Sequence, residues 1–295
     1  MINDLVSVII TTYKRNVDLL MQAVESVRQQ SYNAIEIIIV DDNGLNTEYQ
    51  RKNYELFSQD SGIKYIVNVR NSGAQYSRNI GFLESQGEYV AFLDDDDLWD
   101  PEKIEKQVKF LNENNLDMVF CNGYRFYNND INDRRLYQFN FISDNVISYD
   151  TELISDRIGS TSHPLIRRAS IAKAGLFDID MPARQDYEMW LRLCKYCKVQ
   201  GINEPLFFYR YHDSERITHS SDKAITSYLL LWRKYRNSYK KNRQARARIQ
   251  LTMATEYLKM KRYFRFIYHF AYSLLSAPYV FIEVLSNHKH NKPTF

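Results

Sequence analysis

Short runs of β-branched and aromatic residues recur four times in the first 95 residues. They are Val6–Thr12 (VSVIITT), Ile35–Val40 (IEIIIV), Ile63–Val67 and Tyr89–Leu93 (YVAFL). Near-continuous apolar runs of this length are typical of strands buried on both faces of a parallel sheet, because a half-exposed sheet alternates polar and apolar residues. The sequence therefore predicts an α/β fold built on an open, mostly parallel sheet.

Helical periodicity separates these runs. Apolar residues recur at helical spacing from Leu19 to Val27, with Asp18 as the expected N-cap, and Ala74–Ser85 is a second expected helix. Right-handed crossovers would bring the carboxyl ends of the strands to one edge of the sheet, where ligands bind in such folds. We therefore expect the polar residues that follow the strands, namely Tyr13, Asp42 and Asp94–Asp97, to converge there.

Four consecutive aspartates, Asp94–Asp97, follow the fourth strand directly. Adjacent carboxylates repel each other by roughly a few kcal/mol unless a cation is present. Oxygen-only ligands suit Mg²⁺ or Mn²⁺, so the cluster predicts a divalent metal site. The alternative is a solvated acidic turn or a helix N-cap, since Asp100-Pro101-Glu102 begins an expected helix.

Several segments together resemble the family 2 glycosyltransferases. They are VSVIITTYKR near the start, IIIVDDNG, the block GAQYSRNIGFLESQGEYVAFLDDDDLWDPEKI and a later QDYEMWLRL. The resemblance spans about residues 5–220. It implies a GT-A fold, Rossmann-like with a mostly parallel sheet flanked by helices, and an inverting, metal-dependent sugar transfer from a nucleotide-diphosphate donor. The part beyond about residue 221 is then a C-terminal helical extension.

The resemblance assigns the nucleotide to three residues at the ends of the first two strands. Thr11 and Tyr13 would lie at the nucleobase, with the Tyr13 ring as a stacking face. Asp42 would accept the N3–H of uracil, which favours a UDP-sugar. The alternatives are an aromatic residue at the rim for Tyr13 and an Asx-type turn for Asp42.

The resemblance likewise assigns roles around the diphosphate. Asp96 would bind the metal, Mn²⁺ or Mg²⁺, together with Asp94, while Asp94 and Asp95 would reach the ribose or a metal-bound water. Arg78 would hold the diphosphate or steer the aspartates, with a surface salt bridge as the alternative. Asp97 would instead cap the following helix.

A base is needed to deprotonate the acceptor hydroxyl. In the family this is an acidic residue at the start of a later helix, commonly in a Glu-Asp pair, and Asp186 matches its second position. Gln185 departs from the first position, which puts the supporting hydrogen bonds in doubt. Asp186 as a simple N-cap is the alternative, and Glu188 is the reserve candidate for the base or an acceptor contact.

Three further residues are candidates. Trp190 could pack on the acceptor sugar or in the core. His212 lies in a Tyr-Arg-Tyr-His segment that in relatives closes over the donor, and His163 is a possible acceptor residue, although single histidines are more often structural.

Charge and composition divide the chain into a catalytic domain, 1–221, and a basic, aromatic-rich helical extension, 222–295. The domain would consist of a nucleotide-binding half, 1–100, and an acceptor-side half, 101–221. Residues 223–295 hold 15 Lys and Arg but 2 Asp and Glu, against 24 and 34 in residues 1–222. This basic segment favours peripheral contact with a membrane; a helical pair packed on the catalytic domain, a homodimer contact or nucleic-acid binding are alternatives.

The expected function is transfer of a sugar, from UDP in preference to other carriers, to a glycan or lipid-linked saccharide in cell-surface polysaccharide synthesis. An inactive sugar-binding scaffold of the same fold is the alternative, and the negative net charge of the first 222 residues argues against nucleic-acid binding.

Cys121, Cys194 and Cys197 are interpreted as reduced. With no signal peptide recognised, a cytoplasmic protein at the inner face of the cell membrane is expected.

Overall fold

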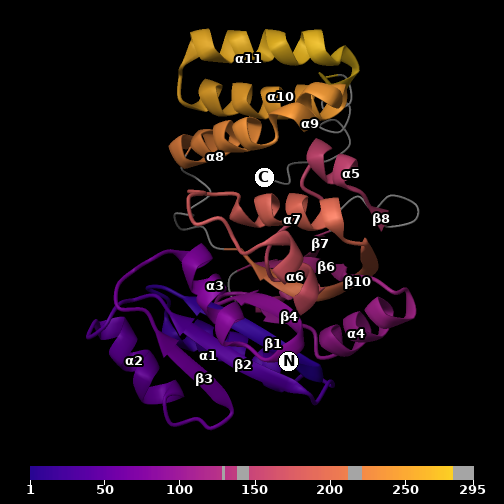
Figure 1. The fold of residues 1–295 in the computed structure, drawn as a ribbon. Helices are drawn as coiled ribbons and strands as arrows, with labels where there is room; N and C mark the ends of the chain where they lie inside the picture. Colours follow the sequence, from indigo (N-terminus) through magenta and orange to yellow (C-terminus); the bar gives the residue numbers. More distant parts are fainter. Residues whose placement is uncertain (128–129, 138–145, 212–220, 282–295) are drawn as a thin grey trace. The chain divides into compact units, whose positions relative to one another are not determined.

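The structure is a computed structural model that describes residues 1–127, 130–137, 146–211 and 221–281 (Figure 1). The chain divides into two compact units. The first contains residues 1–148, 157–179 and 185–213, and the second contains 149–156, 180–184 and 214–295. The second unit therefore takes in two short segments that the sequence pattern assigned to the acceptor-side half. The predicted boundary at residue 221 stays a prediction.

The first unit is built on one sheet. Its described strands are β1 (Ile2–Thr12), β2 (Ile35–Asp41), β3 (Ile63–Val67), β4 (Gly87–Asp94), β5 (Leu98–Trp99), β6 (Met118–Tyr127), β7 (Asp130–Tyr137), β8 (Val146–Ile147), β9 (Leu165–Arg167) and β10 (Val199–Arg210). They follow the order β3-β2-β1-β4-β9-β6-β10-β5, with β7 beside β6 and β8 beside β10.

The four strands expected from the first 95 residues are confirmed, and they pair in parallel. In β1, Thr11 lies opposite Val40 of β2 and Asp94 of β4, so the three strands end in register. Beyond β4 the sheet is mixed, because β9 runs antiparallel to both β4 and β6 while β6 and β10 are parallel. The α/β fold and its parallel first part are thus confirmed, while the sheet as a whole is mixed.

Helices flank this sheet on both faces. Those of the first unit are α1 (Val17–Arg28), α2 (Glu48–Phe57), α3 (Ala74–Glu84), α4 (Lys103–Glu113), α6 (Arg168–Ala174) and α7 (Gln185–Tyr196). Leu20, Val24 and Val27 of α1 share a buried cluster with Val8 and Ile10 of β1. Because successive strand residues point to opposite faces, Ile9 lies on the other face.

That second face is covered by α3, and a glycine permits the contact. A Cβ at Gly81 would lie 2.4 Å from Cγ2 of the fully buried Ile9. No side chain fits at that separation, so the glycine sets how closely α3 approaches β1. This close approach fixes where the first turns of α3 lie along the sheet.

The start of α1 differs from its prediction. The N-cap is Asn16, whose Oδ1 accepts the backbone N–H of Asp18 at 2.9 Å, so the expectation of Asp18 as the cap is wrong. Asp18 instead lies in the first helical turn, where a carboxylate is favoured by the helix dipole.

The second unit is helical. It contains α5 (Tyr149–Ile154), α8 (Ser221–Lys234), α9 (Arg236–Lys241), α10 (Arg243–Lys259) and α11 (Tyr263–Ser276). In α10 the buried side chains include Ala247, Ile249, Met253 and Tyr257, and α8 and α11 both pack on this helix (Figure 1). The predicted helical extension is thus present in the described residues. No helix among them combines the length and apolar character required to cross a membrane.

Candidate functional site

The polar ends of three neighbouring strands lie at one edge of the sheet. Since β1, β2 and β4 are parallel and end in register, Tyr13, Asp42 and Asp94–Asp97 follow at the same edge. The predicted convergence of these residues is therefore present. Thr11, the last β1 residue paired with both neighbours, is half-buried, and Tyr13 is 45% exposed with the Lys14 ammonium 5.3 Å from its ring centre.

Asp42 is buried and organises the loop that follows β3. Its carboxylate accepts the side-chain amides of Asn68 at 2.7 Å and Asn71 at 2.9 Å, and the backbone N–H groups of Ser72 and Gly73, each at 2.8 Å. An aspartate offers about four acceptor positions, and all are in use. Asp42 thus fixes the entry to α3, which carries Arg78.

The four aspartates do not point into one common space. Asp94 accepts Arg78 Nη2 at 2.7 Å and Thr161 Oγ1 at 2.9 Å. Asp95 and Asp96 share Arg15, whose Nε and Nη2 lie 2.8 Å and 3.0 Å from the two carboxylates. The cluster is therefore held apart by arginine side chains rather than solvated as an acidic turn.

Asp97 turns inward. Its carboxylate accepts Ser162 Oγ at 2.7 Å and the backbone N–H of Arg210 at 3.2 Å, and the residue is 1% exposed. The expectation that Asp97 caps the following helix is wrong, because the side chain ties β4 to β10 instead. The Arg210 guanidinium meanwhile donates to the Asp96 carbonyl oxygen at 2.8 Å.

Burial and mutual repulsion make ionisation of Asp95 and Asp97 unfavourable. Burial raises the pKa of Asp95 to about 6; Arg15 opposes this shift and the charge of Asp96 adds to it. The pKa of Asp97 lies well above its ordinary value for the same reasons, burial first and then the charges of Asp96 and Asp94. Additional positive charge at this edge would therefore be favoured.

A divalent cation fits Asp94 and Asp96 by donor type and charge. These two side chains retain 31% and 20% exposure, while that of Asp95 is 7% exposed. The described residues contain no preformed group of three or more His, Cys, Asp or Glu around a metal position. A cation at Asp96 would compete with Arg15, so the metal assignment stays a prediction.

Arg78 is a buried side chain, 6% exposed, so its reading as a surface salt bridge is wrong. Its guanidinium carbon lies 5.7 Å from the ring centre of Phe177. Nη2 bonds Asp94, but the buried Nη1 has no hydrogen-bond partner among the described residues. A buried guanidinium with an unused donor is costly, which indicates a place for an acceptor at this edge.

Arg15 was not among the residues predicted from sequence. Its signal was its place at the end of the segment VSVIITTYKR, three residues beyond the end of β1, where the first strand leaves the same edge. The segment 160–162, which precedes β9, was missed as well. Its three hydroxyl residues turn toward the cluster, where Ser160 and Thr161 bond Asp94, and Ser162 bonds Asp97.

The same segment joins the aspartates to α7. Trp190 Nε1 donates to the carbonyl oxygen of Gly159 at 2.7 Å, immediately before Ser160. Trp190 also packs edge-on against Phe177, the ring beside Arg78. Trp190 is fully buried, so it supports the site from the core and has no surface for an acceptor sugar.

On α7 the two acidic candidates differ in access. Asp186 lies half-exposed in the first turn, where its carboxylate accepts the Tyr187 N–H at 2.8 Å. Glu188 is fully buried and paired with Arg192 at 2.8 Å. The reserve assignment of Glu188 is therefore wrong, because a buried, paired carboxylate cannot meet an acceptor hydroxyl.

His163 is also a core residue. It is fully buried, its Nδ1 lies 2.6 Å from the Ile158 carbonyl oxygen, and its ring contacts Phe207. Burial lowers its pKa to about 3, so the ring is neutral. An acceptor role for His163 is therefore wrong. His212 lies outside the described residues.

Comparison with known proteins agrees with this architecture. Residues 7–175 match the family model of glycosyl transferase family 2. The chain is 35% identical over 211 residues to TuaG of Bacillus subtilis, a putative teichuronic acid biosynthesis glycosyltransferase, with 70% of this chain and 79% of TuaG covered. It is 28% identical over 200 residues to the Escherichia coli UDP-Glc:alpha-D-GlcNAc-diphosphoundecaprenol beta-1,3-glucosyltransferase WfgD, covering 68% and 73%.

A solved structure shares the fold. The crystal structure of S. aureus TarS 1–349 in complex with UDP-GlcNAc superposes with a TM-score of 0.62 at 16% identity, over 77% of this chain and 66% of that one. The fold is therefore that of the GT-A glycosyltransferases. The chain belongs to glycosyl transferase family 2.

The core assignment of His163 predicts an acid-sensitive fold. The folded pKa of about 3 lies below the ordinary value of 6.5, so the neutral ring's stabilisation is complete above pH 6.5 and lost as pH falls toward 3. His163→Asn does not titrate. When the pH is lowered from about 7.5 to about 5, the free energy of unfolding should fall by roughly 2 kcal/mol more in the wild type than in this variant. Urea unfolding at both pH values measures the difference. An equal pH dependence of both proteins would contradict a buried, neutral His163.

Proposed function

We propose that the chain is an inverting glycosyltransferase that moves a sugar from a nucleoside diphosphate to a hydroxyl group of a glycan or lipid-linked saccharide. The observation that carries the proposal is the buried Nη1 of Arg78, which has no hydrogen-bond partner among the described residues beside Asp94 at the carboxyl edge. A diphosphate oxygen is the acceptor that such a guanidinium binds best. Family membership and relatives named for polysaccharide synthesis support the same reading.

The donor would lie across the ends of β1, β2 and β4. Thr11 and Tyr13 would contact the nucleobase, and Asp42 would accept the uracil N3–H. Since the Asp42 carboxylate already accepts four bonds, uracil would have to replace one donor, and Asn71 is the exposed one of its two amide partners. The donor named in WfgD, UDP-Glc, supports a UDP-sugar.

Asp94 and Asp96 would hold Mn²⁺ or Mg²⁺, with Asp95 near the ribose or a metal-bound water. Bound there, the cation would offset the charge of the leaving diphosphate. Arg78 would contribute from the protein side, since it lies beside Asp94 in a water-poor environment. His212, which lies outside the described residues, stays a proposed donor contact.

Asp186 would act as the base. The acceptor oxygen attacks the anomeric carbon while its proton passes to the Asp186 carboxylate. The bond from the anomeric carbon to the phosphate oxygen breaks, and its electron pair leaves with the nucleoside diphosphate. Configuration inverts in this single displacement, and no second nucleophilic carboxylate is needed. The half-exposed position of Asp186 supports this role over Glu188.

We further propose that the enzyme works at the inner face of the cell membrane, where a lipid-linked acceptor is anchored. The basic composition of residues 223–295 supports this localisation. A homodimer contact through residues 222–295 is the competing use of the same segment.

Arg78→Met should weaken UDP binding by about 10–100-fold, the value of a buried hydrogen bond to a charged group. Uridine has no phosphate, so its affinity should not change. Calorimetric titration of both ligands measures this, and Arg70→Met, an exposed arginine in the neighbouring loop, is the matched control. Equal UDP affinity in Arg78→Met and wild type would remove Arg78 from the diphosphate site.

Asp186→Asn should lower kcat for sugar transfer by about 10²–10⁴-fold, because asparagine cannot accept the proton. UDP binding should be unchanged. The rate of transfer is measured from the release of UDP over time in the presence of an acceptor. Asp18→Asn changes a carboxylate in the first turn of a different helix and should leave kcat unaltered. A loss confined to KM would show that Asp186 only positions the acceptor.

A further inference from the structure

Helix α11 presents apolar side chains to solvent along one stripe. Phe264 is 93% exposed and Leu275 is 81% exposed, with Ile267 and Tyr268 also exposed between them. Together with Ala271 they follow the three-and-four spacing of a single helix face. We call Phe264, Ile267, Tyr268, Ala271 and Leu275 the outer stripe.

The opposite face of α11, which packs on α10, carries polar groups. His269 Nδ1 lies 2.6 Å from Gln250 Oε1, and Ser273 Oγ donates to the Ala247 carbonyl oxygen at 2.8 Å. Ser273 is buried. A surface helix in water normally buries its apolar stripe and exposes its polar one. In α11 the exposed stripe is apolar while His269 and Ser273 face inward together with Phe266 and Phe270, which marks the outer stripe as a contact surface.

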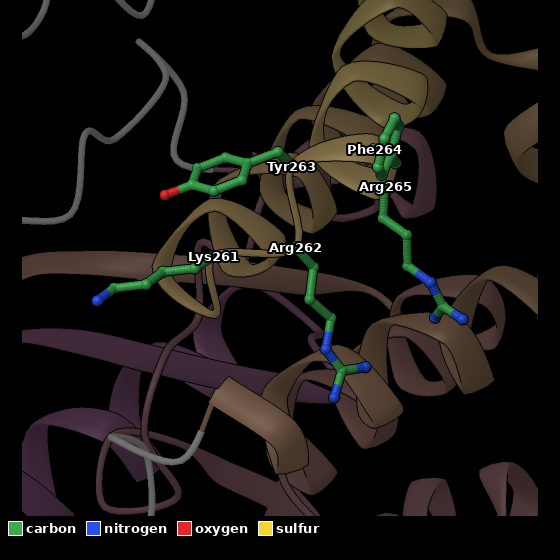
Figure 2. A pocket seen from close by; sticks show the side chains of 5 residues that line it. All are labelled: Lys261, Arg262, Tyr263, Phe264 and Arg265. Carbon is green, nitrogen blue, oxygen red and sulfur yellow. The ribbon is translucent and has the colours of Figure 1, made fainter.

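Positive charge gathers where this stripe begins. A shallow hollow at the start of α11 is lined by Lys261, Arg262, Tyr263, Phe264 and Arg265 (Figure 2). Figure 2 shows the three basic side chains extending away from the helix start. Residues 257–281 contain no Asp or Glu. The surface therefore combines an uncharged, largely aromatic stripe with a basic end, beside which the Asp222 carboxylate of α8 lies 3.8 Å from Arg262 Nη2.

We propose that the outer stripe lies in the headgroup region of an anionic membrane, with lipid phosphates at Lys261, Arg262 and Arg265. Aromatic and aliphatic side chains on one face of a helix insert roughly 5–10 Å into that region, and neighbouring basic residues bind anionic lipid. A second copy of the chain fits less well. Pairing two outer stripes would bring basic ends toward the stretch 257–281 of the partner, which contains no Asp or Glu.

This inference rests on the proposed function only for its purpose, which is to bring the donor site to a lipid-linked acceptor. It makes α11, and not the basic segment as a whole, the membrane-binding element. The outer stripe would supply the apolar contact, and the basic end would supply the preference for anionic over neutral lipid. Substitutions in the stripe and in the basic end can therefore separate the two contributions.

The test is sedimentation of the full-length chain with vesicles of phosphatidylcholine, alone or with 30% phosphatidylglycerol. Wild-type protein should sediment with the anionic vesicles and bind the neutral ones more weakly. The double variant Phe264→Ser/Leu275→Ser should lose about 10-fold or more in affinity for both, since two large apolar groups no longer leave water. Lys261→Gln/Arg262→Gln should lose about 30-fold, for anionic vesicles only.

Leu83→Ser is the matched control, because this exposed leucine lies in α3 of the first unit and its loss should leave vesicle binding unchanged. Thermal unfolding verifies that each variant is folded. UDP binding is measured separately, so failure of the donor site and failure of the membrane surface are distinguishable. Vesicle binding unaltered by Phe264→Ser/Leu275→Ser would overturn the proposal. The proposal would also be overturned if the wild-type protein did not bind vesicles but formed a dimer, and if Phe264→Ser/Leu275→Ser abolished that dimer.

Discussion

The dispersal of negative charge at the end of β4 is the constraint on which the site depends. Four adjacent carboxylates, Asp94–Asp97, follow one strand, and they are directed to three separate counter-groups. Arg78 takes Asp94, Arg15 takes Asp95 and Asp96, and the backbone N–H of Arg210 meets Asp97. Because these partners come from three separate parts of the first unit, the aspartates also fix how β1, α3 and β10 are assembled around the edge.

The parallel sheet could be predicted from sequence because its signal is local. Strands buried on both faces must be apolar throughout, and Val6–Thr12 and Tyr89–Leu93 show this without reference to any other residue. The convergence of Asp42 with Asp94–Asp97 then follows from topology alone, since parallel strands end at one edge. The later, mixed part of the sheet was harder, because β9 is only three residues long and its pairing is set by contacts distant in sequence.

The side chains around the cluster could be predicted only in part. A buried polar residue and a functional one look alike in a sequence, so His163 and Glu188 were assigned to the acceptor although both are fully buried. Arg15 was overlooked for the converse reason: although it ends the segment VSVIITTYKR, a basic residue after a strand has no assigned role until its carboxylate partners are known. Residues 160–162 carry no motif, and their role depends wholly on where β9 places them beside Asp94.

The central claim is that this edge binds a nucleoside diphosphate through Arg78 and a divalent cation at Asp94 and Asp96. Calorimetric titration of UDP into the wild-type protein, with Mn²⁺ or with EDTA, tests it most directly. The account predicts binding that is at least about 10-fold tighter with Mn²⁺, because the cation relieves the repulsion between the diphosphate and the aspartates. Equal affinity in EDTA, or no UDP binding under either condition, would contradict it.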